Sequence, residues 1–65
     1  MAAMEKLLRK AGSERVSSKA ALELAKALEE LGLEIGRDAA ELAKHAGRKT
    51  VVDEDVKLAM KKSRQ

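Results

Sequence analysis

The order of apolar and polar residues along the chain predicts one long helix in its middle. Apolar residues recur there at spacings of three and four, which is the period of one helix face and not the alternation of a strand. This apolar stripe comprises Leu24, Leu28, Leu31, Ile35, Ala39, Leu42 and Ala46. Ser17 or Ser18 is suited to cap its start, and Gly47 is the next strong stop. The pattern therefore predicts a helix from about residue 18 to residue 46.

Two shorter helices are predicted on either side of the long one. The first runs roughly over residues 3–11 and ends at Gly12, because glycine permits the turn that closes a helix. The third spans about residues 54–62, and the Asp53 side chain is expected to cap it. The chain is therefore expected to form an all-α single domain over residues 1–65, with the order short helix, loop, long helix, loop, short helix.

The predicted long helix is too long and too apolar to be covered by its own chain. About 29 residues at 1.5 Å each span roughly 43 Å, which exceeds the diameter of a compact globule of this chain length. Since two short helices leave the centre of the apolar stripe uncovered, we predict an obligate homodimer whose separated chains are largely unfolded. Gly32 and Gly36 share a face there and leave room for a close crossing, although each costs roughly 1 kcal/mol against alanine. The alternative is that the helix only tolerates them.

The composition excludes several classes of protein. The 65 residues contain no cysteine, no proline, no aromatic residue and a single histidine. Disulfides and thiolate metal sites are therefore excluded, and one histidine cannot form a metal centre alone. Without aromatic side chains the chain cannot stack on unpaired bases, which argues against single-strand binding. No apolar run is long enough to cross a bilayer and no catalytic motif is present, so we expect a soluble, intracellular protein that is not an enzyme and uses no cofactor or metal.

The charges are segregated along the chain. Residues 20–43 carry two cations and six acids, whereas the remaining residues carry twelve cations and five acids. The formal charge of +3 therefore combines an acidic middle with basic ends and loops. Such segregation suits a polyanion that touches the ends and loops. The alternative is a set of solvated helix faces, which any helical protein rich in lysine and glutamate can have.

The stretch K-H-A-G-R-K-T over residues 44–50 carries the most specific chemistry. Gly47 breaks the long helix, and two cations and a hydroxyl follow it at once: Arg48, Lys49 and Thr50. This set suits an anion such as a phosphate backbone, although cations at a helix C-terminus also suit the helix dipole. Residues 50–52 are β-prone but too short for a sheet, and the natural pairing partner is the region of residues 15–16.

Four segments of the chain resemble archaeal histones, the small tail-less proteins that package DNA. These segments are A-G-S-E-R-V-S (residues 11–17), L-A-K-A-L-E-E (24–30), L-A-K-H-A-G-R-K-T (42–50) and V-D-E-D-V-K-L-A (52–59). The resemblance covers nearly everything after Met4 and implies a histone fold in which two chains form a handshake homodimer. It further implies sequence-nonspecific binding and compaction of double-stranded DNA in the cytoplasm, on the chromosome or nucleoid.

The resemblance also implies which residues bind DNA: Lys6, Arg9, Lys10, Arg15, Ser17, Lys49 and Thr50. Arg15 matches the family's arginine that enters the minor groove, and Thr50 matches the threonine that helps to hold it. In the handshake dimer each first loop lies beside the partner's second loop, so both loops form one DNA-binding edge. Contacts of this kind read DNA shape and bendability rather than base identity.

Three further residues match the contact through which archaeal histone dimers join into tetramers or longer chains on DNA. They are Leu42, His45 and Asp55. His45 could donate a hydrogen bond to Asp55 of a neighbouring dimer, whereas a lone histidine at a helix end is otherwise an ordinary surface residue. Arg48 and Asp55 could also pair within one chain, as a structural salt bridge that orients the turn.

A second interpretation is a histone-fold protein-interaction module that forms heterodimers and binds DNA weakly. The acidic middle favours this interpretation, and so does Val52, which stands where family members often carry lysine. Arg15, Lys49 and Thr50 favour DNA more strongly. Under either interpretation the partners are macromolecules, with no membrane and no small-molecule substrate.

Overall fold

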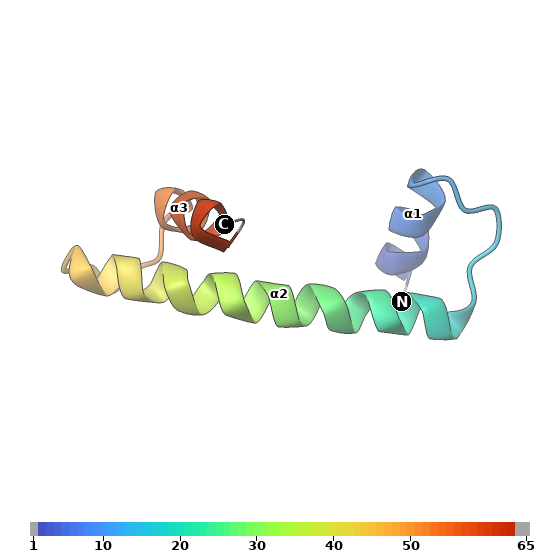
Figure 1. Ribbon diagram of the computed structural model, residues 1–65, viewed down its shortest axis with the longest axis horizontal. Helices are drawn as coiled ribbons and strands as arrows, with labels where there is room; N and C mark the ends of the chain where they lie inside the picture. Colours follow the sequence, from blue (N-terminus) through green and yellow to red (C-terminus); the bar gives the residue numbers. More distant parts are fainter. Residues whose placement is uncertain (1, 64–65) are drawn as a thin grey trace. The chain divides into compact units, whose positions relative to one another are not determined.

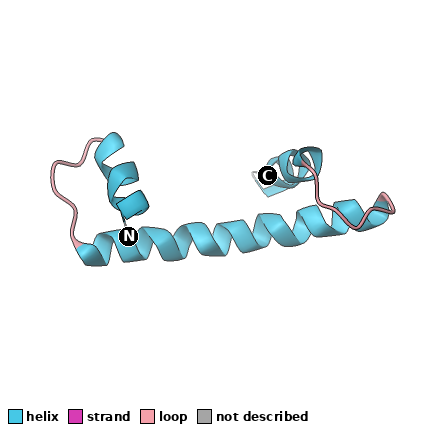
Figure 2. Cartoon of the chain, turned by 180° about the vertical axis from the view of Figure 1, so that it is seen from behind, coloured by secondary structure: helices cyan, strands magenta, loops and turns pink. Residues whose placement is uncertain are grey.

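The computed structural model describes residues 2–63 and contains three helices joined by two loops (Figures 1 and 2). Helix α1 spans Ala2–Lys10, α2 spans Ser18–His45 and α3 spans Asp53–Ser63. No strand occurs within these residues, so the predicted all-α class is confirmed. Two compact units divide the chain, Met1–Glu30 and Leu31–Gln65. Each unit is described separately.

The start of α2 is capped by Ser17. Its hydroxyl oxygen accepts a hydrogen bond from the backbone N–H of Ala20 at 3.1 Å, which satisfies one of the N–H groups that a helix start leaves unpaired. Ser18 is already the first helical residue. Of the two serines that the sequence offered, Ser17 is therefore the N-cap.

The end of α2 is closed by Gly47, as the sequence predicted. The glycine has a φ of 72°, a left-handed value that a side chain would disfavour. Its N–H donates to the Lys44 carbonyl at 2.9 Å, and the N–H of Arg48 donates to the Ala43 carbonyl at 2.9 Å. These two bonds form a Schellman motif and satisfy two of the last carbonyls of the helix. Gly12 closes α1 in the same way, with a φ of 118°.

The start of α3 differs from the prediction. Asp53 was expected to be the cap, but it is the first helical residue, and Val52 is the N-cap because its carbonyl accepts the N–H of Val56 at 3.4 Å. The capping side chain belongs to Asp55, whose Oδ2 accepts the N–H of Val52 at 2.9 Å. This is the backward half of a capping box, in which the third helical residue bonds to the N-cap. Asp53 instead lies 3.8 Å from Lys57 as an exposed ion pair.

Only small side chains are fully covered within one chain. The buried apolar residues among the described part are Ala21, Ala39, Ala43 and Ala59, and no large side chain is fully buried. Nine large apolar residues stay exposed: Leu7, Leu22, Leu28, Leu31, Leu33, Val51, Val56, Leu58 and Met60. A core of alanines gives little hydrophobic stabilisation, since this effect scales with the apolar area removed from water.

The solvent-accessible surface area also shows that one chain buries little apolar surface. The chain exposes 5573 Å², whereas an independently folded monomer of 7.0 kDa exposes about 4,000 Å². Gly32 and Gly36 belong to this open surface, because no atom of the chain lies within 4 Å of a Cβ built on either one, apart from their own helix backbone and chain neighbours.

Candidate nucleic-acid interface

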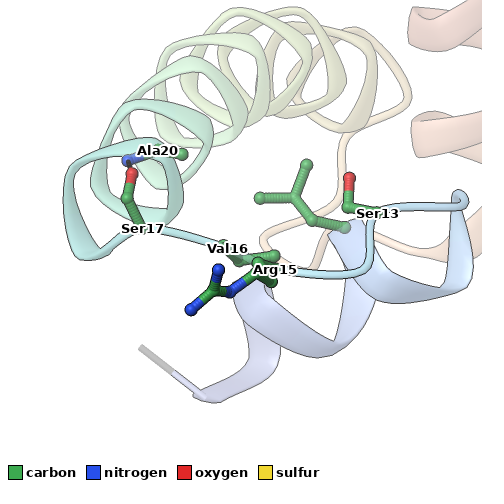
Figure 3. A pocket seen from close by; sticks show the side chains of 6 residues that line it. Ser13, Arg15, Val16, Ser17 and Ala20 are labelled. Carbon is green, nitrogen blue, oxygen red and sulfur yellow. Dashed lines mark hydrogen bonds between the residues drawn. The ribbon is translucent and has the colours of Figure 1, made fainter.

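The first loop forms a hollow with the residues on either side of it (Figure 3). Its lining comprises Leu8, Ser13, Arg15, Val16, Ser17 and Ala20. Figure 3 shows the Ser17 hydroxyl oxygen beside the Ala20 backbone nitrogen and the Arg15 guanidinium away from the Ser13 hydroxyl. Because the Ser17 oxygen acts as acceptor for the cap, its O–H remains a donor for an external oxygen. Arg15 is exposed. The loop therefore offers one cation and two hydroxyls.

Helix α1 adds three more cations to the same unit. Lys6, Arg9 and Lys10 are all exposed, and the last two lie in the final turn of the helix. Cations in that turn also complement the negative end of the helix dipole. None of the three appears in an ion pair among the described residues. Their charge is therefore directed to solvent.

The second loop is held by a bidentate ion pair between Arg48 and Asp55. Nη1 of Arg48 lies 2.7 Å from Oδ2 of Asp55, and Nη2 lies 2.8 Å from Oδ1. Nη1 also donates to the backbone carbonyl of Thr50 at 3.1 Å. Two parallel charge-assisted hydrogen bonds fix orientation as well as distance. One arginine thus ties the loop backbone to the first turn of α3.

Burial and hydrogen bonding shift the titration of this pair. Asp55 is only 3% exposed, and its pKa is lowered to about 2, first by the hydrogen bond from Arg48 and then by the N–H of Val52. The pKa of Arg48 is raised, chiefly by the same hydrogen bond to Asp55. Hydrogen bonds to the charged form outweigh the desolvation that opposes it. The carboxylate is therefore ionised at any physiological pH.

Lys49 and Thr50 project from this braced loop. Both residues are exposed. The Thr50 carbonyl is occupied by Arg48, whereas its hydroxyl makes no hydrogen bond within the described residues. The hydrogen bonds of Arg48 fix the loop backbone and leave the Lys49 ammonium and the Thr50 hydroxyl exposed to solvent. This arrangement can bind phosphate oxygens with little ordering of the loop.

The three residues expected at a dimer–dimer contact occupy the same unit but differ in exposure. Leu42 is half-buried and His45, the last residue of α2, is exposed. Asp55 is buried and accepts three hydrogen bonds, two from Arg48 and one from Val52. A carboxylate has about four lone-pair sites, so one acceptor site remains. The in-chain partner of Asp55 is Arg48.

The structure brings together only part of the set expected from the sequence. Arg15 and Ser17 lie in the first unit, and Lys49 and Thr50 lie in the second. The two β-prone segments, residues 15–16 and 50–52, form no strand within the described chain. Sequence reasoning also missed Ser13, a polar residue of the first loop that lines the hollow beside Arg15. The signal was present, because a serine follows the capping glycine directly.

A short helix, a long central helix and a second short helix, joined by two loops, are the elements of a histone fold. The chain matches the family model described as "Histone-like transcription factor (CBF/NF-Y) and archaeal histone" over residues 1–60. The chain therefore belongs to this family, in which a handshake dimer is typical. The resemblance to archaeal histones is thereby confirmed.

Two individual relatives support the same assignment. A subunit of the archaeal histone HAN1 from Thermococcus zilligii is 57% identical over 61 residues, which are 94% of this chain and 91% of that protein. "Probable archaeal histone 3" of Methanocaldococcus jannaschii is 55% identical over 56 residues, which are 86% of this chain and 84% of that protein. Both are similar to this chain over most of their length.

The described residues offer neither a membrane span nor a metal centre. None of the helices has the length and apolar content that a bilayer crossing requires. No group of three or more histidine, cysteine, aspartate or glutamate side chains is placed to hold a metal ion within the described part.

Proposed function

We propose that this chain binds and compacts double-stranded DNA without sequence specificity, as a histone-fold dimer. The observation that carries the proposal is the second loop, where the Arg48–Asp55 pair fixes the backbone and leaves Lys49 and Thr50 exposed. Such a loop suits phosphate contacts, which position a protein on DNA without reading its sequence. Membership of a family that includes archaeal histones supports the same conclusion.

Dimerisation completes the proposed DNA-binding edge. In the proposed handshake, the first loop of one chain lies beside the second loop of its partner, with the two short β-prone segments paired. Arg15 then enters the minor groove next to the partner's Lys49 and Thr50, while Ser17 donates to a phosphate. Lys6, Arg9 and Lys10 of the paired first helices meet a further stretch of backbone. The exposed leucines of α2 support the dimer, because a second copy is the simplest way to cover them.

Dimers are further proposed to join into tetramers or longer chains on DNA. The contact consists of Leu42 and His45, with the His45 ring donating to the remaining acceptor site of Asp55 in the neighbouring dimer. The three bonds already made by Asp55 hold its carboxylate in one orientation, which suits a directional contact. The chain acts as a structural protein of the nucleoid and not as an enzyme.

A salt series tests the proposed function. A labelled random-sequence duplex is titrated with the protein at about 50, 100 and 200 mM salt. Over this range the affinity that comes from phosphate contacts falls steeply. We expect binding at low salt and a steep, linear fall of the logarithm of affinity with the logarithm of salt concentration. Affinity that stays flat over this range contradicts the proposal.

The same titration also tests the heterodimer interpretation. One relative is itself named as a subunit of a histone, which makes a mixed pairing worth testing. Binding that is absent for the chain alone but appears when a second histone-fold chain is added favours the heterodimer. Binding by the chain alone favours the homodimer.

A further inference from the structure

A second hollow lies beside the last turn of α2, within the unit of residues 31–65. This open depression has a volume of about 390 Å³, which is ample for a phosphate group because roughly 10–15 Å³ of such space already holds a water molecule. Its lining includes Lys44, Arg48, Lys49, Glu41, Ala40 and Val51. Three cationic residues and one acidic residue therefore line one depression. Lys44 is the member of this set that the proposed DNA-binding residues do not include.

The ammonium of Lys44 is free for an external partner. A lysine in the last turn of a helix often serves the final carbonyl groups, but here backbone donors already bond the carbonyls of Ala43 and Lys44. Neither Lys44 nor Lys49 is part of an ion pair among the described residues. Both lysines are exposed. Their positive charge is thus not taken up by an ion pair within the described residues.

The guanidinium of Arg48 gives the hollow a fixed edge. Three of its five N–H donors are used, by the Thr50 carbonyl and the two carboxylate oxygens of Asp55. The remaining two donors belong to a side chain that is 38% exposed. Because the ion pair immobilises this group, it offers hydrogen bonds to a ligand without a further loss of side-chain entropy.

We propose that this hollow holds a phosphate of the DNA backbone next to the one that Lys49 and Thr50 contact, with Lys44 as its principal cation. The proposal rests on the proposed function and extends the contact of the second loop back along α2. The ammonium of Lys44 and the fixed guanidinium of Arg48 match the charge and the acceptor oxygens of a phosphate. Glu41 opposes them, since its carboxylate lines the same hollow.

Two substitutions of opposite sign test this site. Lys44→Gln removes the proposed contact from each chain of the dimer, and Glu41→Gln removes the opposing charge. Lys57→Gln on α3 and Glu23→Gln on α2 are the controls, because both residues are exposed and form ion pairs away from the hollow, with Asp53 and Lys26 respectively. Fluorescence anisotropy with a labelled duplex of about 30 base pairs measures the affinity and its salt dependence for each variant.

The expected result separates the site from a general charge effect. Each lost phosphate contact lowers the slope of log affinity against log salt by about 0.9, so Lys44→Gln lowers it by about 1 to 2 for a dimer. Glu41→Gln strengthens binding, whereas both controls change the slope by less than half as much as Lys44→Gln. Lys44→Arg retains the wild-type slope, because it keeps the charge.

Three outcomes overturn the proposal. In the first, the wild-type protein binds duplex DNA but Lys44→Gln matches Lys57→Gln; the proposed function then stands and the phosphate site fails. In the second, Lys44→Gln leaves the salt slope unchanged but weakens dimerisation, measured as the concentration dependence of thermal unfolding. This result would mean that the second copy of the chain, and not DNA, covers the hollow. If the wild-type protein binds no duplex at low salt, the proposed function fails, and the phosphate site fails with it.

Discussion

Two leucines of α2 allow the predicted dimer interface to be tested with a matched pair of substitutions. Leu31 belongs to the apolar stripe, whereas Leu33 lies two residues on and therefore about 200° around the helix. Their exposures in one chain are nearly equal, 46% and 51%. Leu31→Ala and Leu33→Ala remove the same atoms from the same helix and change helix propensity equally. They differ only in the face that they alter.

The expected loss can be worked from the exposed area. Full burial of a leucine is worth about 1.5–3 kcal/mol, and Leu31 keeps 46% of its surface for a partner to cover. Covering it therefore contributes about 0.7–1.4 kcal/mol per chain. The dimer has two copies, so Leu31→Ala weakens dimerisation by about 1.5–3 kcal/mol, or about 10- to 100-fold in the dissociation constant. Leu33→Ala is expected to change it by less than about threefold.

Sedimentation equilibrium gives the dissociation constants, and circular dichroism during heating at several protein concentrations gives the coupled stability. We expect the unfolding midpoint to rise with protein concentration, because dimers are favoured by mass action. Equal effects of the two substitutions would refute the idea that the apolar stripe is the interface. A midpoint that does not depend on concentration would refute obligate dimerisation itself.

Two further predictions concern Asp55 and His45. The folded pKa of Asp55 is about 2, below its ordinary value of 3.8, so its stabilising effect is complete above pH 3.8 and is lost as the pH falls through about 2. The unfolding temperature of Asp55→Asn should therefore fall less than that of the wild type when the pH is lowered from 5 to 2, which are about the limits of this titration. The exposed control Asp53→Asn should fall as much as the wild type. If Asp55→Asn also falls as much as these two proteins, this assignment is contradicted. His45→Ala should shorten protein chains on DNA while a single dimer still binds a short duplex, as measured by light scattering and anisotropy; unchanged assembly size counts against the proposed contact.

The helix boundaries were predictable from sequence because local groups decide them. Gly12 and Gly47 end their helices through backbone bonds within a few residues, and Ser17 bonds an N–H three residues away. The cap of α3 was mispredicted although its bond is equally local, because the N-cap is Val52, whose side chain cannot cap, and only the returning bond from Asp55 is present. The role proposed for Lys44 was not predictable either. Its neighbours Arg48, Lys49 and Val51 meet it only after the loop folds back.

The alanine core has a consequence for how the newly synthesised protein folds and assembles. Among the described residues the only buried apolar side chains are alanines. In the proposed obligate dimer, folding and pairing are therefore a single bimolecular event, and its yield depends on how much chain the cell makes. A newly synthesised chain at low abundance stays open to proteolysis until it meets another. The choice of partner, whether an identical chain or a related histone, is consequently fixed during folding and cannot be postponed until DNA is reached. Expression level thereby sets both the amount and the composition of the dimers.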